Sequence, residues 1–293
     1  MQYGFIGLGQ MGKPMALNLG KSCDVLAFDP RPGIIQNGGR AQQVQALAQL
    51  AQCDAIILCL PNEDVIRDVL FTDGFAQTLR AGTAVIDTST INYNAALDIG
   101  ARLDDLGLPF LDAPVSGMQK RAEDATLTMM VGGDADLLAR HKPALDSMAN
   151  NILHMGPRGA GQLTKLINQL LFDINMAALA EIMPMSAKLG LDPEKMAAVV
   201  NSGTGRSFAS EFFLPNILQG VFDQGYPMGH AYKDLVSGAE LGARQGIPMP
   251  VLAAATATYQ RALAEGLGAQ DKGAMIKVFE TLLGTEFRAG HNE

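Results

Sequence analysis

The sequence predicts an α/β domain with a mostly parallel sheet, followed by an all-helical domain. Up to about residue 160, short apolar runs alternate with helical stretches. Beyond that point only long helical patterns follow. A glycine-rich loop comes directly after the first apolar run, as in doubly wound sheets that bind nucleotides. We therefore expect a doubly wound sheet over residues 1–160 and a helical domain over residues 161–293.

The composition is typical of a globular protein of two ordinary domains. The chain has 293 residues, of which 48% are hydrophobic and 18% are charged, and its net charge is −8. Nucleic-acid binding is not expected, because phosphate contacts need clustered Lys and Arg. Three scattered cysteines and an N-terminus without a signal-peptide pattern favour a reducing, cytoplasmic location.

Buried strands are predicted wherever a run of four to seven apolar residues is closed by Gly, Pro, Asp or Ser. Runs of this kind read as parallel strands with helices between them. The predicted strand runs are "YGFIGLG", "DVLAFD", "DAIILCLP", "TAVIDTS", "LPFLDAPVS", "LTMMVGG" and "NILHMG".

The second half shows helical periodicity interrupted by Gly- and Pro-containing turns. The first of these helices should carry the chain across the domain boundary. Pro184 is expected to kink or end it, since proline lacks an N–H and clashes with the preceding turn. Charged residues interrupt its apolar run, so we expect no membrane span. The predicted helices cover residues 161–189, 193–201, 207–221, 229–245, 250–265 and 272–283.

The loop "GLGQMG" has the G-x-G-x-x-G spacing between a predicted strand and a predicted helix. Gly7 permits a tight turn, Gly9 lets the backbone approach a pyrophosphate, and Gly12 lets the helix pack closely on the strand. The free N–H groups of the helix N-terminus would bind the phosphates. We expect a Rossmann-type dinucleotide site that also includes Leu8, Gln10 and Met11.

The second predicted strand ends in Asp29, about 20 residues beyond the loop, as this fingerprint requires. A carboxylate there binds the ribose hydroxyls of NAD and repels the 2′-phosphate of NADP. NAD is therefore the expected cofactor, although Arg31 leaves NADP open.

Leu60, Pro61 and Asn62 follow the next buried strand, at the sheet edge where open α/β folds bind ligands. These residues either contact the cofactor or form an ordinary loop in which Asn62 caps the next helix. The sequence does not separate these two interpretations.

Lys165 lies in the first turns of a long apolar helix, where a cation opposes the helix dipole. One interpretation is a lysine whose amine reaches water. The other is a lysine kept at an unfavourable place for its chemistry, with Asn168 and Gln169 on the same helix face one turn later.

Four separated segments together resemble the β-hydroxyacid dehydrogenase family, which includes 3-hydroxyisobutyrate dehydrogenase and tartronate semialdehyde reductase. The resemblance covers nearly the whole chain. These segments are "GLGQMGKPMALNL", "DAPVSG" at 112–117, "GAGQLTKLINQ" at 159–169 and "YKDL" at 232–235.

The resemblance implies a role for several residues. Lys165 matches the catalytic lysine of the family, and Asn168 the first Asn of its "KxxNN" pattern, with Gln169 in place of the second. Thr90 matches a residue near the nicotinamide, and Lys233 a lysine that contacts the cofactor from the helical domain.

Ser116 and Gly117 match the turn that binds the substrate carboxylate in the family. The usual "SGG" is here completed by Met118, and the usual "GTL" has Ala125 in place of its glycine. Independently of the resemblance, consecutive N–H groups after a strand end can form an anion-binding nest, with the Ser116 hydroxyl as a further donor. A plain turn is the alternative.

The residues fit transfer of a hydride between a nicotinamide and a short hydroxy acid. A lysine can take or give the hydroxyl proton if burial lowers its pKa toward the working pH. Arg206 and Phe208 either reach the substrate, Arg206 as a ligand for a second acid group, or belong to a solvated loop. The histidines show no metal-ligand spacing, so no metal is expected.

We therefore expect an NAD(P)-dependent dehydrogenase of short 3-hydroxy acids or their semialdehydes. The alternatives are an NADPH-dependent semialdehyde reductase of the tartronate, succinic or sulfolactaldehyde type, an imine reductase, and a non-catalytic binding module with the same fold. The presence of Lys165 argues against the imine reductase. The apolar helical half further predicts a homodimer or homotetramer.

Overall fold

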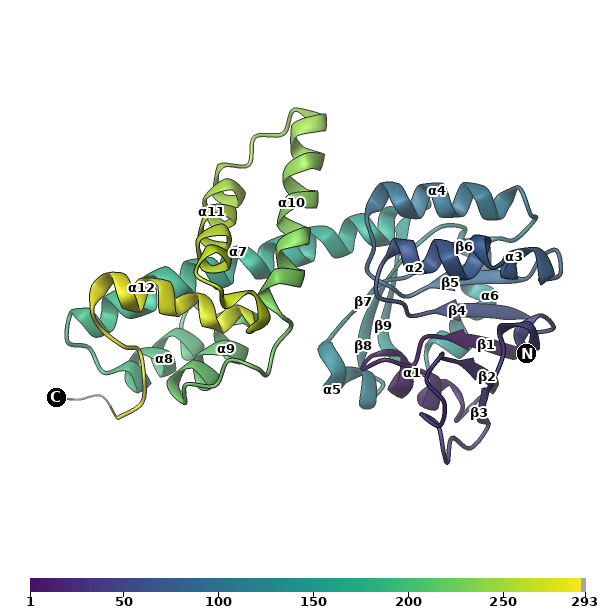
Figure 1. Ribbon diagram of the computed structural model, residues 1–293, viewed down its shortest axis with the longest axis horizontal. Helices are drawn as coiled ribbons and strands as arrows, with labels where there is room; N and C mark the ends of the chain where they lie inside the picture. Colours follow the sequence, from purple (N-terminus) through teal and green to yellow (C-terminus); the bar gives the residue numbers. More distant parts are fainter. Residues whose placement is uncertain (291–293) are drawn as a thin grey trace. The chain divides into compact units, whose positions relative to one another are not determined.

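The computed structural model describes residues 1–290, whose elements alternate between strands and helices up to residue 156 and are helical afterwards (Figure 1). In the first part these are β1 Gln2–Ile6, α1 Gly12–Leu19, β2 Asp24–Phe28, β3 Ala41–Val44, η1 Leu47–Leu50, β4 Ala55–Leu58, α2 Glu63–Arg67, η2 Asp68–Thr72, α3 Phe75–Thr78, β5 Ala84–Asp87, α4 Tyr93–Asp104, β6 Phe110–Asp112, β7 Val115–Ser116, α5 Met118–Glu123, β8 Leu127–Gly132, α6 Ala135–Leu145 and β9 Ala149–Gly156. The second part contains α7 Ala160–Lys188, α8 Pro193–Ser202, α9 Phe208–Leu218, α10 Met228–Gln245, α11 Pro250–Ala264, η3 Leu267–Ala269, η4 Lys272–Met275 and α12 Ile276–Leu283.

The chain divides into two compact units, which are described separately below. The first, here called the cofactor unit, is Met1–Lys165, and the second, the helical unit, is Leu166–Glu293. The division falls inside α7, whereas the sequence places the domain boundary at 160/161.

The cofactor unit is built on one sheet with the order β3-β2-β1-β4-β5-β6-β8-β7, and β9 pairs with β8. All pairs are parallel except β6 with β8 and β7 with β8. The predicted, mostly parallel sheet is thus confirmed. The sequence missed β3, because its residues "AQQV" form a half-polar edge strand without an apolar run.

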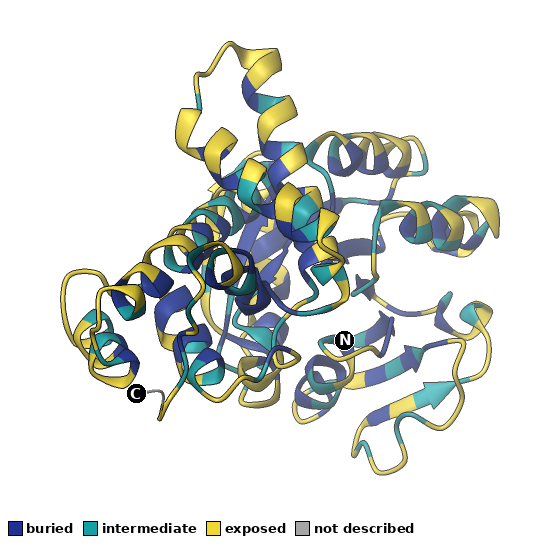
Figure 2. Ribbon diagram, turned by 60° about the vertical axis from the view of Figure 1, so that its left-hand side comes forward, coloured by how far each residue is buried: buried dark blue, intermediate teal, exposed yellow. Residues whose placement is uncertain are grey.

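The two faces of this sheet pack against different helices, as the alternation of side chains along β1 illustrates. Tyr3 and Phe5 belong to the core shared with α1, α5 and α6. Ile6 belongs to the core shared with α2, α3 and α4 on the opposite face. The central strands β4 and β5 are buried along their whole length, in agreement with the buried centre of the sheet in Figure 2. Because both faces are covered, the sheet is doubly wound, and function must lie at its edges.

The helical unit has its own core, which the remainder of α7 shares with α8 to α12. The predicted helices are found within a few residues of their expected ends, although η4 replaces the first turn of the helix expected at 272–283. Pro184 does not end α7, which continues to Lys188. Proline removes one backbone hydrogen bond, and the neighbouring buried residues Met183 and Ser186 keep the helix in place.

Among residues 1–290, α7 is the one helix that length and composition alone would allow to cross a membrane. A helix of a globular core can pass the same test, so this result is weak evidence. The helix contains the buried residues Lys165 and Asp173.

Candidate active site

The glycine loop joins β1 to α1 at the carboxyl end of the sheet. The N–H of Gly7 donates to the carbonyl of Phe28 at 2.9 Å, which ties the loop to the end of β2. Gly7 has a φ of +97°, and a Cβ there would lie 2.3 Å from the carbonyl oxygen of Cys59. A Cβ on Gly12 would lie 2.0 Å from the carbonyl oxygen of Gly7. Both glycines are therefore required by geometry, as the spacing predicts.

Gly9 differs from these two, because a Cβ at this position would meet no atom within 4 Å. Within residues 1–290, the N–H groups of Gly9 and Gln10 donate to no protein acceptor. The loop thus presents free N–H donors and an open space directly before α1. This is the cradle that a pyrophosphate fills at a helix N-terminus, so these residues fit a dinucleotide.

Asp29 holds the loop from the end of β2. Its Oδ2 accepts the N–H of Leu8 at 2.8 Å, and its Oδ1 accepts Nε of Arg31 at 2.9 Å. Burial alone would raise the pKa of Asp29, but the hydrogen bonds from Arg31 and from the backbone lower it overall. The carboxylate is therefore charged and already paired with Arg31. The guanidinium is exposed and has room to move aside for a ligand.

The loop after β4 shows how the carboxyl edge of the sheet is fixed. Asn62 caps α2 by accepting the N–H of Val65 at 3.0 Å, which is the N-cap alternative of the sequence analysis. The N–H of Leu60 donates to the hydroxyl of Ser89 at 2.8 Å. Leu60 and the half-buried Thr90 therefore belong to neighbouring loops at this edge, and Pro61 is exposed.

The predicted substrate turn comes directly after β7. Gly117 has a φ of +142°, and a Cβ there would lie 2.8 Å from Cβ of Arg121 and 3.1 Å from Cδ2 of Leu127. Ser116 is half-buried at the end of β7. The positive φ explains why only glycine fits at 117.

Met118 and Ala125 are the only non-glycine residues with positive φ in the part of the chain that the structure describes. Their φ values are +60° and +56°. Both replace residues that the resemblance leads us to expect as glycine. Met118 is the first residue of α5 and Ala125 follows its C-cap, so both ends of this helix carry a backbone conformation that glycine adopts more easily.

A further contact, which the sequence does not reveal, joins the end of α1 to the end of α5. Nδ2 of Asn18, near the end of α1, donates to the carbonyls of Ala122 and Glu123 at 2.7 and 3.2 Å. Asn18 is buried. The two helices that begin at the two predicted binding loops are therefore linked by one amide.

Lys165 lies in the second turn of α7 and is 8% exposed. The helix begins against the end of β6, where Asp112 accepts the N–H groups of Gly159 and Gln162 at 2.7 and 2.9 Å. The amine is thus carried by a buried helix start rather than by a surface helix. The side chain of Lys165 is not free of interactions.

Two buried carboxylates lie side by side at this sheet edge, because Asp87 and Asp112 are register partners on β5 and β6. Burial raises the pKa of both, and that of Asp87 reaches about 7. Oδ1 of Asp87 accepts the N–H of Ser89, whereas its Oδ2 has no partner among the described residues.

In the helical unit, the predicted residues belong to separate contacts. Asn168 is exposed on α7, and Lys233 is exposed on α10. Nε2 of Gln169 lies 3.5 Å from Oδ2 of the buried Asp234. Gln169 of α7 therefore contacts the "YKDL" segment through Asp234, and not through the predicted Lys233.

Arg206 and Phe208 stand at the start of α9, whose N-cap is Ser207. Nε of Arg206 pairs with Glu211 at 2.6 Å, and both side chains are largely exposed. The ring of Phe208 contacts that of Phe172 with centroids 5.6 Å apart. Arg206 would have to leave Glu211 to bind an acid.

The helical unit also contains a buried ion pair that the sequence does not reveal. Lys272 of η4 donates to Asp173 of α7, and both are almost completely buried. The hydroxyl of Tyr259 donates to the same carboxylate at 3.3 Å, and the ring of Phe172 lies 4.1 Å from the amine. No local motif indicates this cluster, because its two charged residues lie 99 residues apart.

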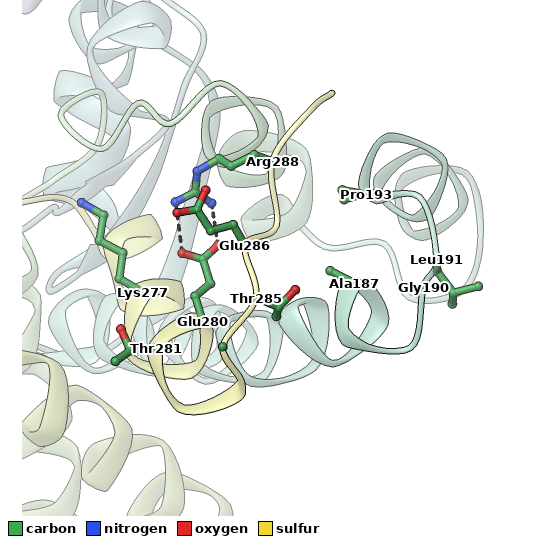
Figure 3. A pocket seen from close by; sticks show the side chains of 11 residues that line it. Ala187, Gly190, Leu191, Pro193, Lys277, Glu280, Thr281, Thr285, Glu286 and Arg288 are labelled. Atoms are coloured by element: carbon green, nitrogen blue, oxygen red, sulfur yellow. Dashed lines mark hydrogen bonds and ion pairs between the residues drawn. The ribbon is translucent and has the colours of Figure 1, made fainter. Parts of the chain in front are cut away.

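The helical unit contains an open hollow of about 750 Å³ that none of the predicted residues lines. Figure 3 shows Glu280 of α12 paired with Arg288, from the segment after α12, in the lining of this hollow. Because Arg288 and Glu280 neutralise each other, this pair leaves no free charge in the hollow to bind a substrate.

Comparison with known protein families matches both parts of the chain. Residues 2–156 match the NAD binding domain of 6-phosphogluconate dehydrogenase. Residues 159–279 match the NAD-binding domain of NADP-dependent 3-hydroxyisobutyrate dehydrogenase.

Individual relatives match over nearly the full length. The 2-(hydroxymethyl)glutarate dehydrogenase of Eubacterium barkeri is 37% identical over 99% of this chain and 98% of its own length. A crystal structure of 3-hydroxyisobutyrate dehydrogenase from Salmonella typhimurium has a TM-score of 0.86 at 30% identity, covering 95% of this chain and all of that one. The corresponding Mycobacterium tuberculosis enzyme, solved with L-serine, has a TM-score of 0.83 at 32% identity, covering 94% and 98%. The chain therefore belongs to the β-hydroxyacid dehydrogenases, a family of NAD(P)-dependent oxidoreductases that includes 3-hydroxyisobutyrate dehydrogenase.

Proposed function

We propose that this protein interconverts a short 3-hydroxy acid and its semialdehyde, with Lys165 as the general acid and base. One observation supports this most strongly. Lys165 is a buried lysine on a helix start fixed to the carboxyl edge of the sheet, in the unit that also contains the glycine loop. A buried amine at a ligand-binding edge has little structural use and an evident chemical one.

The cofactor, when bound, accepts or supplies the hydride. The chain would supply the proton transfer and the orientation. In the oxidation, the neutral Nζ of Lys165 takes the proton of the substrate hydroxyl, and in the reduction, the ammonium returns it to the carbonyl oxygen. The amides of Asn168 and Gln169, on the same helix face, are suited to hydrogen-bond that oxygen.

The substrate carboxylate would bind at Ser116 and Gly117. The support is a turn with a positive φ directly after β7 and a half-buried serine hydroxyl. A short acid with a small 2-substituent fits the presence of a methionine at 118, because its side chain takes space that a glycine would leave free. A second acid group, as in the substrate that names the Eubacterium barkeri relative, would require Arg206 to leave Glu211.

We propose NAD as the preferred cofactor on the strength of Asp29. Its carboxylate is charged and lies beside the N–H of Leu8, where the adenosine ribose of a Rossmann-type site lies. NADP is the alternative, since Arg31 can offer its guanidinium to a 2′-phosphate.

The protein is further proposed to be a cytoplasmic homodimer or homotetramer that binds neither nucleic acid nor membrane. Large apolar side chains are exposed along α7, among them Ile167, Leu171 and Ile182. A second copy that covered them would remove this apolar surface from water. Sedimentation velocity would contradict the oligomer by showing a 31 kDa species at micromolar concentration.

The experiment that tests the activity compares Lys165→Ala with Lys188→Ala. Lys188 is an exposed lysine in the last turn of the same helix. Loss of a general acid and base lowers kcat by roughly 10²–10⁴-fold. We expect this loss for Lys165→Ala alone, with an unchanged Kd for NAD, in a screen of 3-hydroxy acids with both cofactors. Near-native turnover by Lys165→Ala would refute its role.

A further inference from the structure

The start of α7 is fixed to the sheet by a carboxylate that is buried and receives only backbone donors in that contact. Asp112 ends β6, and its two oxygens accept the N–H groups of Gly159 and Gln162 at 2.7 and 2.9 Å. The first N–H groups of a helix have no partner within the helix, so this carboxylate satisfies two of them. It also lies at the positive end of the helix dipole.

Gln162 makes a second connection, from the helix to the loop after β5. Its Nε2 donates to the carbonyl of Ser89 at 2.7 Å, and its Oε1 accepts the N–H of Ile91 at 3.1 Å. The side chain is 2% exposed, so water does not compete for these bonds. Both partners flank Thr90, and the hydroxyl of Ser89 accepts the N–H of Leu60. One amide therefore joins α7 to two loops of the carboxyl edge.

Two glycines allow this close approach. A Cβ on Gly161 would lie 2.4 Å from the carbonyl oxygen of Met130 and 2.5 Å from that of Asp112. A Cβ on Gly132 would lie 2.5 Å from Oδ1 of Asp112. The helix start thus touches β6 and β8 with backbone against backbone, which leaves little freedom for rotation or sliding.

Lys165 follows Gln162 by three residues, so the two side chains leave the helix on the same side. We propose that Asp112 and Gln162 are positioning residues for Lys165, and that they fix its amine relative to the loop containing Thr90. This inference rests on the proposed catalytic role of Lys165. Neither residue would touch the reacting atoms, and each acts through the helix.

An ordinary helix cap would not make these connections, and the same unit offers one for comparison. Asp134 caps α6 by accepting the N–H of Leu137 at 2.7 Å. Asp112 instead sits on a strand and fixes a helix that is distant in sequence, at the cost of burying its charge. Asp134→Ala is therefore a matched control, because it removes a cap in the same unit without touching α7.

The test is a double-mutant cycle between Gln162→Ala and Lys165→Ala. Alanine keeps the helix, because it is a strong helix former. A displacement of about 1 Å can cost on the order of 10²-fold in rate, so Gln162→Ala should lower kcat by about tenfold to 10²-fold. The Kd for NAD should change less than twofold. In the Lys165→Ala background, the same substitution should have no further effect on the residual rate, because there is no amine left to position.

Two further readouts separate positioning from stability. The pH profile of kcat should shift in Gln162→Ala and stay unchanged in Asp134→Ala, although the cap variant loses stability. Hydrogen exchange at the N–H groups of Gly159 and Gln162 should accelerate in Asp112→Asn, which keeps one acceptor, and its kcat should be higher than that of Asp112→Ala.

The outcomes are distinguishable. If Lys165→Ala is inactive but Gln162→Ala matches Asp134→Ala in kcat and pH profile, the positioning proposal is wrong and the proposed function stands. If the effects of Gln162→Ala and Lys165→Ala multiply in the double variant, Gln162 acts on the fold or on the cofactor instead. If Lys165→Ala keeps near-native turnover, both proposals are wrong.

Discussion

The cofactor unit and the helical unit each hold a buried carboxylate, but the two carboxylates have different partners. In the cofactor unit, Asp112 accepts two backbone N–H groups at the start of α7. In the helical unit, Asp173 contacts the side chains of Lys272 and Tyr259, although the buried Asp271 of the same unit accepts backbone N–H groups. Asp112 therefore depends on backbone conformation, and Asp173 on a matched charge. The difference predicts which substitutions each unit tolerates.

The largest expected effect is on the buried ion pair of the helical unit. Lys272→Met leaves the carboxylate of Asp173 buried without its cation, which costs about 3–5 kcal/mol of the free energy of unfolding. The double variant Lys272→Met/Asp173→Leu should regain most of this loss. Lys142→Met breaks an exposed pair with Asp146 and should cost at most about 1 kcal/mol. Urea unfolding measures all three, and equal losses for Lys272→Met and Lys142→Met would contradict the comparison.

In the cofactor unit, the matching test is Gly9→Ala. A Cβ at Gly9 meets no protein atom, so the fold should be unaffected, but it would fill the space proposed for the pyrophosphate. Losing a hydrogen bond to a charged group costs about 1.5–3 kcal/mol, or roughly 10- to 150-fold in the Kd for NAD. Gly205→Ala is the control, since its Cβ would meet only Val200, at 3.7 Å. Titration calorimetry that finds unchanged affinity for Gly9→Ala would remove this loop from the cofactor site.

The preference for NAD over NADP should change when Arg31, which pairs with Asp29, is replaced. Arg31→Ala removes a guanidinium able to bind a 2′-phosphate and frees the carboxylate, so kcat/KM with NADP should fall about tenfold relative to NAD, as for a charge-assisted hydrogen bond. Asp29→Asn should change the ratio in the opposite direction. A wild-type preference for NADP would overturn the proposed order of cofactors.

The raised pKa of Asp87 should be visible in how the free energy of unfolding depends on pH. Burial raises its pKa to about 7, so the folded state binds a proton that the unfolded state has released above a pKa of about 4. The free energy of unfolding contributed by this group therefore falls as the pH rises from about 4 to 7, by at most about 1.4 kcal/mol per pH unit. Asp87→Asn should lack this term, so its stability relative to the wild type should improve as pH rises. A difference between the two proteins that stays constant from pH 4 to 8 would show that folding does not raise the pKa of Asp87.

Much of the architecture can be predicted from local sequence, because buried strands need apolar runs and helices need a regular apolar face. The glycine loop and Asp29 can also be predicted from local sequence, because the fingerprint is defined by the spacing of its residues along the chain. The edge strand β3 fails this test, because "AQQV" has no apolar run. Pro184 wrongly suggests that the helix ends there, because tertiary packing keeps α7 helical beyond the proline.

The residues that local sequence does not reveal are those whose partners are distant. Asp112 accepts hydrogen bonds from the start of a helix about fifty residues later in the chain. Lys272 donates to the carboxylate of Asp173, which lies 99 residues earlier. Gln162 looks like one more polar residue of its segment until its two bonds around Thr90 are seen. Lys165 is the exception, because an awkward lysine in an apolar helix is visible before any contact is known.

The left-handed residues at the two ends of α5 bear on how this enzyme should be engineered. In a library that randomises position 118 to change the substrate, glycine and asparagine would be enriched simply because they relax the backbone at a φ of +60°. Such enrichment would be mistaken for improved recognition. Position 125 has nearly the same φ, +56°, and lies outside the substrate turn. Randomising it in parallel measures the backbone preference alone, and subtracting that preference leaves the part of the selection at 118 that belongs to the substrate.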